Sequence, residues 1–401
     1  MTVKGLTQFL GKIAMFLYII SYFITASGLF PQILLSVSLY FFAGMGIISL
    51  LIQSKINSRY LIWYFLFIVV SIIGIIYCPG KDWGDTLYKM IVVLVLALAF
   101  TQFVNEKKDF DFVVYSYVIG ALLLFFILLF TDRLHEDDRL GTTAMGNANI
   151  FASYFMMAGV LAIWLLVHSN KKSEKLFLLI STIIIFYALL LSGGRKFVVV
   201  PVVFLYILLL LKKDKKGRNH TIIYTLIIIG IVWFGYGLIM HNEILYDSIG
   251  QRMEGLINSF IGGETDFSTE MREKMRTVAF IRGWESPFWG HGFDSFKYLA
   301  QEELNFYAYS HNNWTEMWYN HGLLGLVAYY SYYVIMLRAF IKLRRKSMAL
   351  SSFGIATIIA VFIFEYGAVS YVLIPIQILL CLVAVAYNIE RKEKRLDDGK
   401  N

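Results

Sequence analysis

Ser310-His311-Asn312-Asn313-Trp314-Thr315-Glu316, with Gly322-Leu323-Leu324-Gly325 just after it, ends a long polar segment in an otherwise apolar chain. Of the 401 residues, 58% are hydrophobic and only 16% are charged. A soluble domain of this composition would expose large apolar patches, so the sequence predicts a polytopic membrane protein. The polar segment, 241–320, is then the largest part of the chain that faces water.

Twelve apolar segments have or approach the roughly 17 to 25 residues that a helix needs to cross a bilayer. They lie near 12–26, 29–52, 60–77, 86–104, 111–130, 147–167, 176–191, 197–211, 220–240, 322–341, 349–367 and 369–388. The sequence therefore predicts an all-α fold of about twelve transmembrane helices, which form a single integral membrane domain, 1–401. The segment 241–320 becomes one large extracytoplasmic loop, with short helices, inserted between spans 9 and 10.

Lysine and arginine are distributed unevenly between the two sides of this arrangement. Both termini and basic runs such as 212–218 and 342–346 fall on one side, and cationic loops stay in the cytoplasm. We therefore expect cytoplasmic termini and an extracytoplasmic face that carries 241–320. The net charge of +8 belongs to these loops, so the expected partner is the lipid bilayer and not a nucleic acid.

Ionisable residues are scarce within the predicted spans, and Lys89, Arg338 and Glu365 lie near span ends. Ion-coupled transport needs such groups at mid-depth, which argues against a transporter such as a lipid-linked oligosaccharide flippase. Metal-ligand spacings, such as His-x-x-x-His or paired cysteines, are absent from the sequence outside the membrane. We expect neither a metal nor a cofactor.

Two glycine-containing patches carry arginines at the outer face. The first, 139–149, leads into span 6 and contains Arg139 and Asn149. The second, 191–196, is a tight turn that presents Arg195, and its glycines would let phosphate oxygens approach the backbone. An ordinary inter-helix loop and an ordinary hairpin turn are the alternative interpretations.

The third patch, 268–284, has the pattern of an amphipathic helix. Met271, Met275 and Val278 form an apolar stripe at helical spacing. Arg272 and Arg276 are four residues apart and share one face. A helix lying on the membrane surface would have the same pattern.

The fourth patch contains His311, just before a predicted helix start. Asn313 and Glu316 are placed as the cap and the third helical residue of a capping box. The positive end of that helix disfavours imidazolium, so the sequence predicts a neutral His311 that is able to accept a proton. A loop histidine without a role is the alternative.

Together the four patches predict a single functional site. Guanidinium groups without a metal site suit a phosphate-bearing substrate, because arginine binds phosphate oxygens in bidentate fashion. A neutral histidine beside them suits proton abstraction from an attacking hydroxyl. This combination predicts group transfer from a diphosphate-activated donor.

The same motifs resemble those of the O-antigen ligase and polymerase superfamily of bacterial membrane proteins. Pro287-Phe288-Trp289-Gly290-His291-Gly292 looks like its Pro-x-x-Gly-x-Gly segment, and His311-Asn312 with Gly322-Leu323-Leu324-Gly325 is similar to its His-Asn and Gly-Leu-Leu-Gly signature. The turn before Arg195 looks like the family's Ser-Arg turn. The patch from Arg139 to Asn149 looks like its Arg-x-Gly and Asn-Pro-Asn step.

This resemblance implies a metal-independent glycosyltransferase of the bacterial plasma (inner) membrane, acting on a glycan carried by undecaprenyl diphosphate. His311 would be the base on the acceptor hydroxyl, and Arg139, Arg195 and Arg272 would hold the diphosphate. The secondary candidates that the motifs suggest are Arg276, Asn312, Glu316 and Asn149. A polymerase of capsule or O-antigen repeat units and a ligase acting on a lipid or protein acceptor both fit. The partners implied are the glycan donor and acceptor, a chain-length regulator and a flippase.

Overall fold

The computed structural model describes residues 2–53, 58–134, 139–212, 220–260, 267–343 and 349–398. Twelve of the helices in this part of the chain, with 16 to 31 residues, each coincide with one predicted span. They are α1 (Val3–Thr25), α2 (Ile33–Gln53), α3 (Arg59–Ile75), α4 (Gly84–Phe103), α5 (Lys107–Phe130), α7 (Ala148–His168), α8 (Lys172–Leu191), α9 (Arg195–Leu211), α10 (Thr221–His241), α15 (Asn313–Leu343), α16 (Ala349–Phe364) and α17 (Ile374–Asp398).

Nine of these helices are long and apolar enough to cross a membrane. The other three, α3, α9 and α16, have 17, 17 and 16 residues. No strand is found among the described residues. The all-α, polytopic membrane class that the composition predicts is confirmed.

Several helices extend beyond the apolar segments that predict them. α1 starts at Val3 instead of residue 12, and α17 continues to Asp398 instead of 388. Backbone hydrogen bonding does not stop at the hydrocarbon boundary, and a cap can start a helix outside it. α5 starts at Lys107 in this way, behind a capping box of Glu106 and Asp109.

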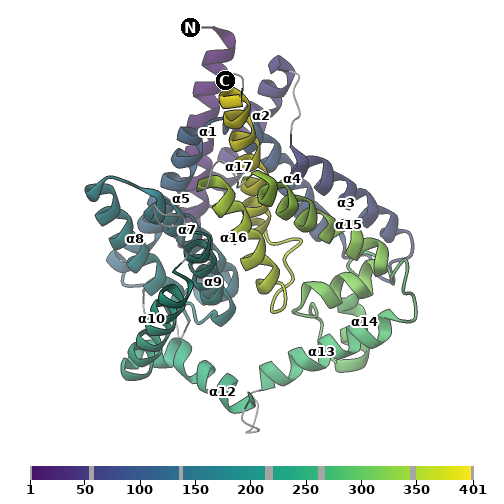
Figure 1. The fold of residues 1–401 in the computed structure, drawn as a ribbon. Coiled ribbons are helices and arrows are strands. Elements are labelled where there is room, and N and C mark those ends of the chain that lie inside the picture. The colour runs from purple at the N-terminus through teal and green to yellow at the C-terminus, as the bar shows by residue number, and fades with distance from the viewer. Residues whose placement is uncertain are drawn as a thin grey trace.

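α7 and α17 form the centre of the bundle, and α10 lies at its edge. The apolar windows of α7 and α17 are each 83% buried, whereas that of α10 is 6% buried. The first residues of α1 and the last residues of α17 lie at the same end of the molecule, at the top of Figure 1. The cytoplasmic location of both termini stays a prediction.

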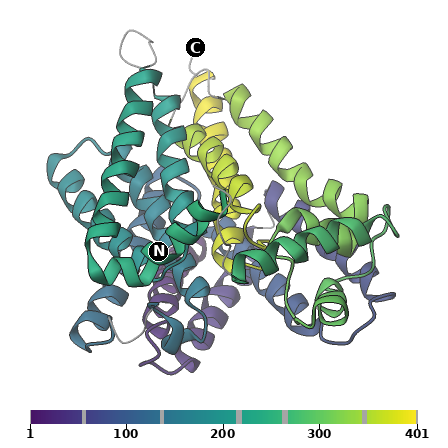
Figure 2. The ribbon, with the colours of Figure 1, turned by 90° about the horizontal axis from the view of Figure 1, so that it is seen from below.

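Short helices occupy the segment between α10 and α15, as the sequence predicts. They are α11 (Glu243–Leu245), the π-helix η1 (Tyr246–Gly250), α12 (Gln251–Phe260), α13 (Phe267–Gly283) and α14 (Phe296–Leu304). In Figure 1, α12 and α13 run across the end of the bundle opposite the termini. Seen from below, they lie between α10 and α15 (Figure 2). One further short helix, α6 (Thr142–Met145), precedes α7.

α15 is broken at Gly322, where φ is 60° and ψ is −156°. After the break, the amide of Leu323 donates to the carbonyl of Pro287 at 2.8 Å. Before the break, the carbonyl of Asn320 accepts from the amide of Gly292 at 3.0 Å. The segment 287–292 therefore satisfies backbone groups that the break leaves without helical partners. Predicted span 10, 322–341, is the second part of α15, and the first part, 313–321, belongs to the site.

Candidate functional site

The His311 loop is held by its own polar neighbours. The Asn312 side-chain oxygen accepts from the amides of Trp314 at 2.9 Å and Thr315 at 3.1 Å, so Asn312 is the helix cap. A Glu316 carboxylate oxygen accepts from the amide of Ser310 at 2.7 Å. His311 lies between these contacts with a left-handed backbone, φ 58°.

The predicted capping box of Asn313 and Glu316 is wrong. The Asn313 side-chain oxygen accepts from the amides of Ser370 at 3.0 Å and Tyr371 at 3.3 Å, which belong to the segment between α16 and α17. The reason is tertiary: Asn313 is fully buried against that segment, so a distant partner replaces the local one. The His311 loop is thereby fixed to a part of the chain more than 50 residues away.

A cavity of about 260 Å³ opens beside His311. We call it the arginine cavity. Its lining residues are Asn149, Gly193, Gly194, Arg195, Lys196, Val199, Arg252, Thr269, Arg272, Arg276, His311, Tyr366 and Gly367. Five of them are cationic and none is acidic, so the cavity is suited to an anion.

Arg139 lies directly behind this lining. Its Nε donates to the carbonyl of Ser192 at 3.1 Å, and Nη2 donates to the side-chain oxygen of Asn149 at 3.2 Å. Gly193 has a φ of 65°, and a Cβ there would lie 2.9 Å from the Arg139 Nε. The glycine turn is therefore needed to admit the arginine. Arg139 contacts the cavity through Asn149.

The turn at the start of α9 presents two cations. Nη1 of Arg195 donates to the carbonyl of Arg252 on α12. The neighbouring Lys196 donates from Nζ to the carbonyl of Gly367 at 2.9 Å. Both bonds join this turn to segments that are far away in the sequence.

α13 supplies Arg272 and Arg276 to the cavity on one face. The guanidinium of Arg276 lies 5.1 Å from the ring centre of Tyr366. The apolar stripe of α13, which adjoins the arginine face, places Met275 in a small core with Tyr319 of α15. The predicted apolar stripe thus packs against α14 and α15. This packing holds α13 where Arg272 and Arg276 line the same cavity as His311.

Electrostatic repulsion is concentrated in this region. Burial, followed by the charges of neighbouring arginines, lowers the pKa of Arg139 to about 10. Burial, followed by the charges of Lys196 and Arg272, lowers the pKa of His311 to about 3. His311 is neutral at physiological pH, as predicted, but the main causes are burial and neighbouring cations, whereas the sequence suggested the positive end of a helix.

The structure brings together most of the residues that the sequence proposed. Arg195, Arg272, Arg276, Asn149 and His311 line the arginine cavity. Asn312 and Glu316 do not line it. They are 3% and 0% exposed, and they hold the backbone on either side of His311.

The lining residues that sequence reasoning missed include Lys196, Arg252 and Tyr366. Lys196 adjoins Arg195, so the sequence contained a signal for it. Arg252 and Tyr366 lie in segments without a motif, and only the tertiary fold brings them to the cavity.

Residues 180–330 match the family described as O-antigen ligase. The predicted superfamily resemblance is confirmed. The matched segment runs from within α8 to within α15 and contains Arg195, Arg272 and His311. The finding supports an O-antigen ligase or polymerase type of glycosyltransferase activity in a multi-pass membrane protein.

Other parts of the cavity lie outside the O-antigen ligase segment, because Asn149 precedes it and Tyr366 follows it. No curated protein matches the chain. Among the described residues, no group of three or more His, Cys, Asp or Glu side chains is placed to hold a metal ion. The independence from metals that the sequence suggests stays a prediction.

Proposed function

We propose that the protein is a membrane glycosyltransferase that polymerises undecaprenyl-diphosphate-linked repeat units into capsule or O-antigen polysaccharide. The reaction would take place at the outer face of the bacterial plasma membrane. The observation that carries the proposal is the arginine cavity, where four arginines, Lys196 and the neutral His311 line one space. The O-antigen ligase match over 180–330 supports the same reaction class.

The cationic side chains would bind the diphosphate of the donor. Arg195 and Arg272 line the cavity, and Arg139 contacts its wall through Asn149. Guanidinium groups keep their charge and bind phosphate oxygens in bidentate fashion. They would stabilise the negative charge that grows on the diphosphate as it leaves.

His311 would act as the general base. The acceptor hydroxyl oxygen attacks the anomeric carbon of the donor sugar, while the hydroxyl proton passes to an imidazole nitrogen. The bond between that carbon and the diphosphate oxygen breaks, and its electron pair stays with the diphosphate. Atoms and charge balance without another reactant, and the proton on His311 is later released to water.

Donor binding would also raise the basicity of His311. Burial and the charges of Lys196 and Arg272 lower its pKa to about 3. A bound diphosphate would compensate those charges and raise the pKa toward the operating pH, where a general base is most effective. Proton abstraction would then be coupled to the presence of the donor.

A ligase that transfers glycan to a lipid or protein acceptor is the second candidate. The family description favours it, because it names O-antigen ligase. The two reactions share the donor and the diphosphate site and differ only in the acceptor. A flippase would use the same donor without forming a glycosidic bond.

The deciding experiment is turnover of a defined undecaprenyl-diphosphate-linked repeat by the purified protein, with and without a candidate lipid acceptor. Elongation without added acceptor supports the polymerase, and product formed only with the acceptor supports the ligase. His311→Ala should reduce turnover roughly 10²- to 10⁴-fold. His241→Ala is the control, since His241 is exposed and lies outside the cavity. Wild-type turnover by a folded His311→Ala variant would contradict the mechanism.

A further inference from the structure

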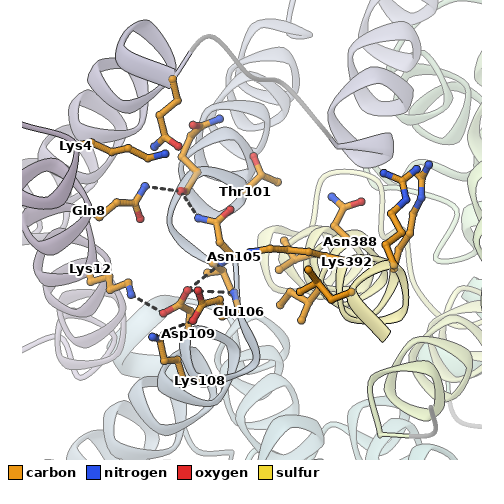
Figure 3. Close-up of a pocket in the computed structure, with 18 residues that line it drawn as sticks. Lys4, Gln8, Lys12, Thr101, Asn105, Glu106, Lys108, Asp109, Asn388 and Lys392 are labelled. Carbon is orange, nitrogen blue, oxygen red and sulfur yellow. Dashed lines mark hydrogen bonds and ion pairs between the residues drawn. The ribbon is translucent and has the colours of Figure 1, made fainter. Parts of the chain in front are cut away.

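A second, larger cavity of about 780 Å³ lies at the opposite end of the bundle (Figure 3). We call it the α1–α17 cavity. It lies between the first half of α1, the segment joining α4 to α5, and the last part of α17. Its lining residues are Lys4, Gln8, Lys12, Gln53, Thr101, Gln102, Val104, Asn105, Glu106, Lys108, Asp109, Val385, Asn388, Ile389, Arg391, Lys392, Arg395 and Leu396.

The α1–α17 cavity is distinct from the arginine cavity. α17 begins just after the segment that contains Tyr366 and Gly367, and its last turns line the second cavity. A helix of 25 residues is about 37 Å long, so the two cavities lie near opposite ends of the long helices. The second cavity has no part in the proposed sugar transfer.

The side chains that line this cavity carry more positive than negative charge. Six lining residues are cationic and only Glu106 and Asp109 are acidic. Asp109 accepts from Lys12 at 2.5 Å, and Glu106 pairs with Lys108 at 2.9 Å. These two pairs leave four further cations in the lining.

The remaining cations are Lys4 on α1 and Arg391, Lys392 and Arg395 on α17, of which Lys392 also attracts Glu106. Within the described part of the chain, Lys4, Arg391 and Arg395 form no ion pair. In Figure 3, Lys4 extends from α1 and Lys392 from α17 into the space between these helices. Two separate helices thus present positive charge to one volume.

The wall of the cavity also contains polar side chains that bond to one another's backbone. Nε2 of Gln8 donates to the carbonyl of Gln102 at 3.1 Å, and Nδ2 of Asn105 donates to the same carbonyl at 2.8 Å. Asp109 accepts from the amide of Asn105 at 3.1 Å. These bonds join α1 to the end of α4 and hold the segment between α4 and α5 against both helices.

We propose that the α1–α17 cavity binds a phosphate-bearing anion, either the headgroup of an anionic phospholipid or free phosphate. The volume falls within the range of small-ligand sites, roughly 300 to 1,000 Å³. Basic pockets between membrane helices suit anionic headgroups, because the cations compensate the phosphate charge close to the membrane surface. Bound here, the anion joins α1, α5 and α17.

The test measures binding to the purified full-length protein in neutral detergent. The probes are short-chain phosphatidylglycerol, short-chain phosphatidylcholine and inorganic phosphate, with affinity read from calorimetric titration. Saturable binding of phosphatidylglycerol but not phosphatidylcholine identifies a lipid headgroup. Equal binding of inorganic phosphate identifies the free anion. Binding of neither phosphate nor phosphatidylglycerol overturns the proposal.

The variant Arg391→Gln, Lys392→Gln, Arg395→Gln should weaken binding roughly 10- to 100-fold, because each cation near the surface contributes to anion affinity. Lys171→Gln, Lys172→Gln, Lys175→Gln is the matched control. It removes three exposed cations at the same end of the bundle but outside the cavity. Equal weakening by both sets would mean non-specific attraction and would also overturn the proposal.

Thermal unfolding without ligand shows whether each variant is folded. If the triple variant of α17 does not fold, Lys4→Gln provides the second measurement, since Lys4 is exposed in the first turn of α1. It should weaken phosphatidylglycerol binding several-fold. Unchanged affinity in that variant would contradict a site between α1 and α17.

Discussion

His311 combines an unusual backbone with a strongly perturbed side chain. Its φ of 58° is a left-handed conformation, which costs an L-residue about 1 to 2 kcal/mol. Ser310 and Asn312, on either side, are held by buried hydrogen bonds that keep the loop in this shape. The surrounding structure therefore imposes the position of the imidazole at the edge of the arginine cavity.

The low pKa of His311 predicts how activity depends on pH. With a pKa of about 3 in the free protein, His311 stays deprotonated across the physiological range, so kcat/KM should not fall between pH 8 and about pH 5 through this group. Donor binding raises the pKa, so kcat should fall as the pH drops through the higher value. Steady-state rates between pH 5 and 9 measure both profiles. An acid limb that is the same in both would contradict the coupling of His311 to the donor.

Arg195 provides a second prediction at the scale of one residue. Arg195→Lys should reduce turnover nearly as much as Arg195→Ala, roughly 10²-fold, because an ammonium group does not reproduce the planar pair of donors. Initial rates with a defined lipid-linked repeat measure the effect. Arg282→Lys is the control, because Arg282 is paired on the surface with Glu285 at 2.7 Å. Full activity of Arg195→Lys would mean that the position serves the turn alone.

At the scale of elements, the break in α15 separates the site from the membrane span. The first part of the helix places Asn313 against the segment before α17, and the second part follows the predicted span 10. The glycine-rich segment 287–292 binds the free backbone groups at the break. The segment 287–292 and the glycine motif at 322–325 thus bond to each other, and together they hold the first part of α15 in place.

This arrangement makes Gly322 sensitive to substitution. A Cβ at this position would lie 2.7 Å from the carbonyl carbon and oxygen of Phe288, and the backbone conformation is one that essentially only glycine adopts. Gly322→Ala should therefore lower the free energy of unfolding by about 1 to 3 kcal/mol or more and reduce turnover. Thermal unfolding in detergent and initial rates measure these effects.

Gly44→Ala is the matched control, since Gly44 lies within α2 and a Cβ there meets nothing within 4 Å. Its stability should be unchanged or higher, because alanine favours helix more than glycine does. If Gly322→Ala unfolds at the wild-type temperature, the break does not need glycine.

At the scale of the whole molecule, two cationic cavities lie near opposite ends of one helix bundle. The end that contains the first residues of α1 and the last residues of α17 also carries the six cations of the α1–α17 cavity. By the distribution of positive charge, that end should face the cytoplasm. The arginine cavity would then face outward.

Cysteine labelling tests this orientation. In a background with Cys78→Ala and Cys381→Ala, Glu285→Cys should react with a membrane-impermeant maleimide in intact spheroplasts. Lys172→Cys should react only after the membrane is opened, because α8 begins at the end of the bundle opposite Arg195. Both side chains are exposed, so access depends on the side of the membrane. The reverse labelling pattern would contradict the proposed outer face.

The sequence predicts elements more completely than it predicts contacts. Apolar segments locate the twelve long helices, because crossing hydrocarbon demands a run of apolar residues and internal backbone bonding. The glycine turn before Arg195 and the patch 139–149 predict two residues of the cavity lining, Arg195 and Asn149. The sequence pattern predicts Asn313 as the helix cap instead of Asn312, since a local pattern does not reveal that a buried distant segment binds Asn313.

The sequence by itself determined the membrane class, the order of the helices and the polar segment that contains His311, because these follow from local composition and spacing. Only the tertiary structure decided that Tyr366, Arg252 and Lys196 line the same cavity as His311, and that α1 and α17 enclose a second cationic cavity. These contacts join segments separated by tens to hundreds of residues. The packing of the whole bundle brings them together, and no local sequence pattern encodes that packing.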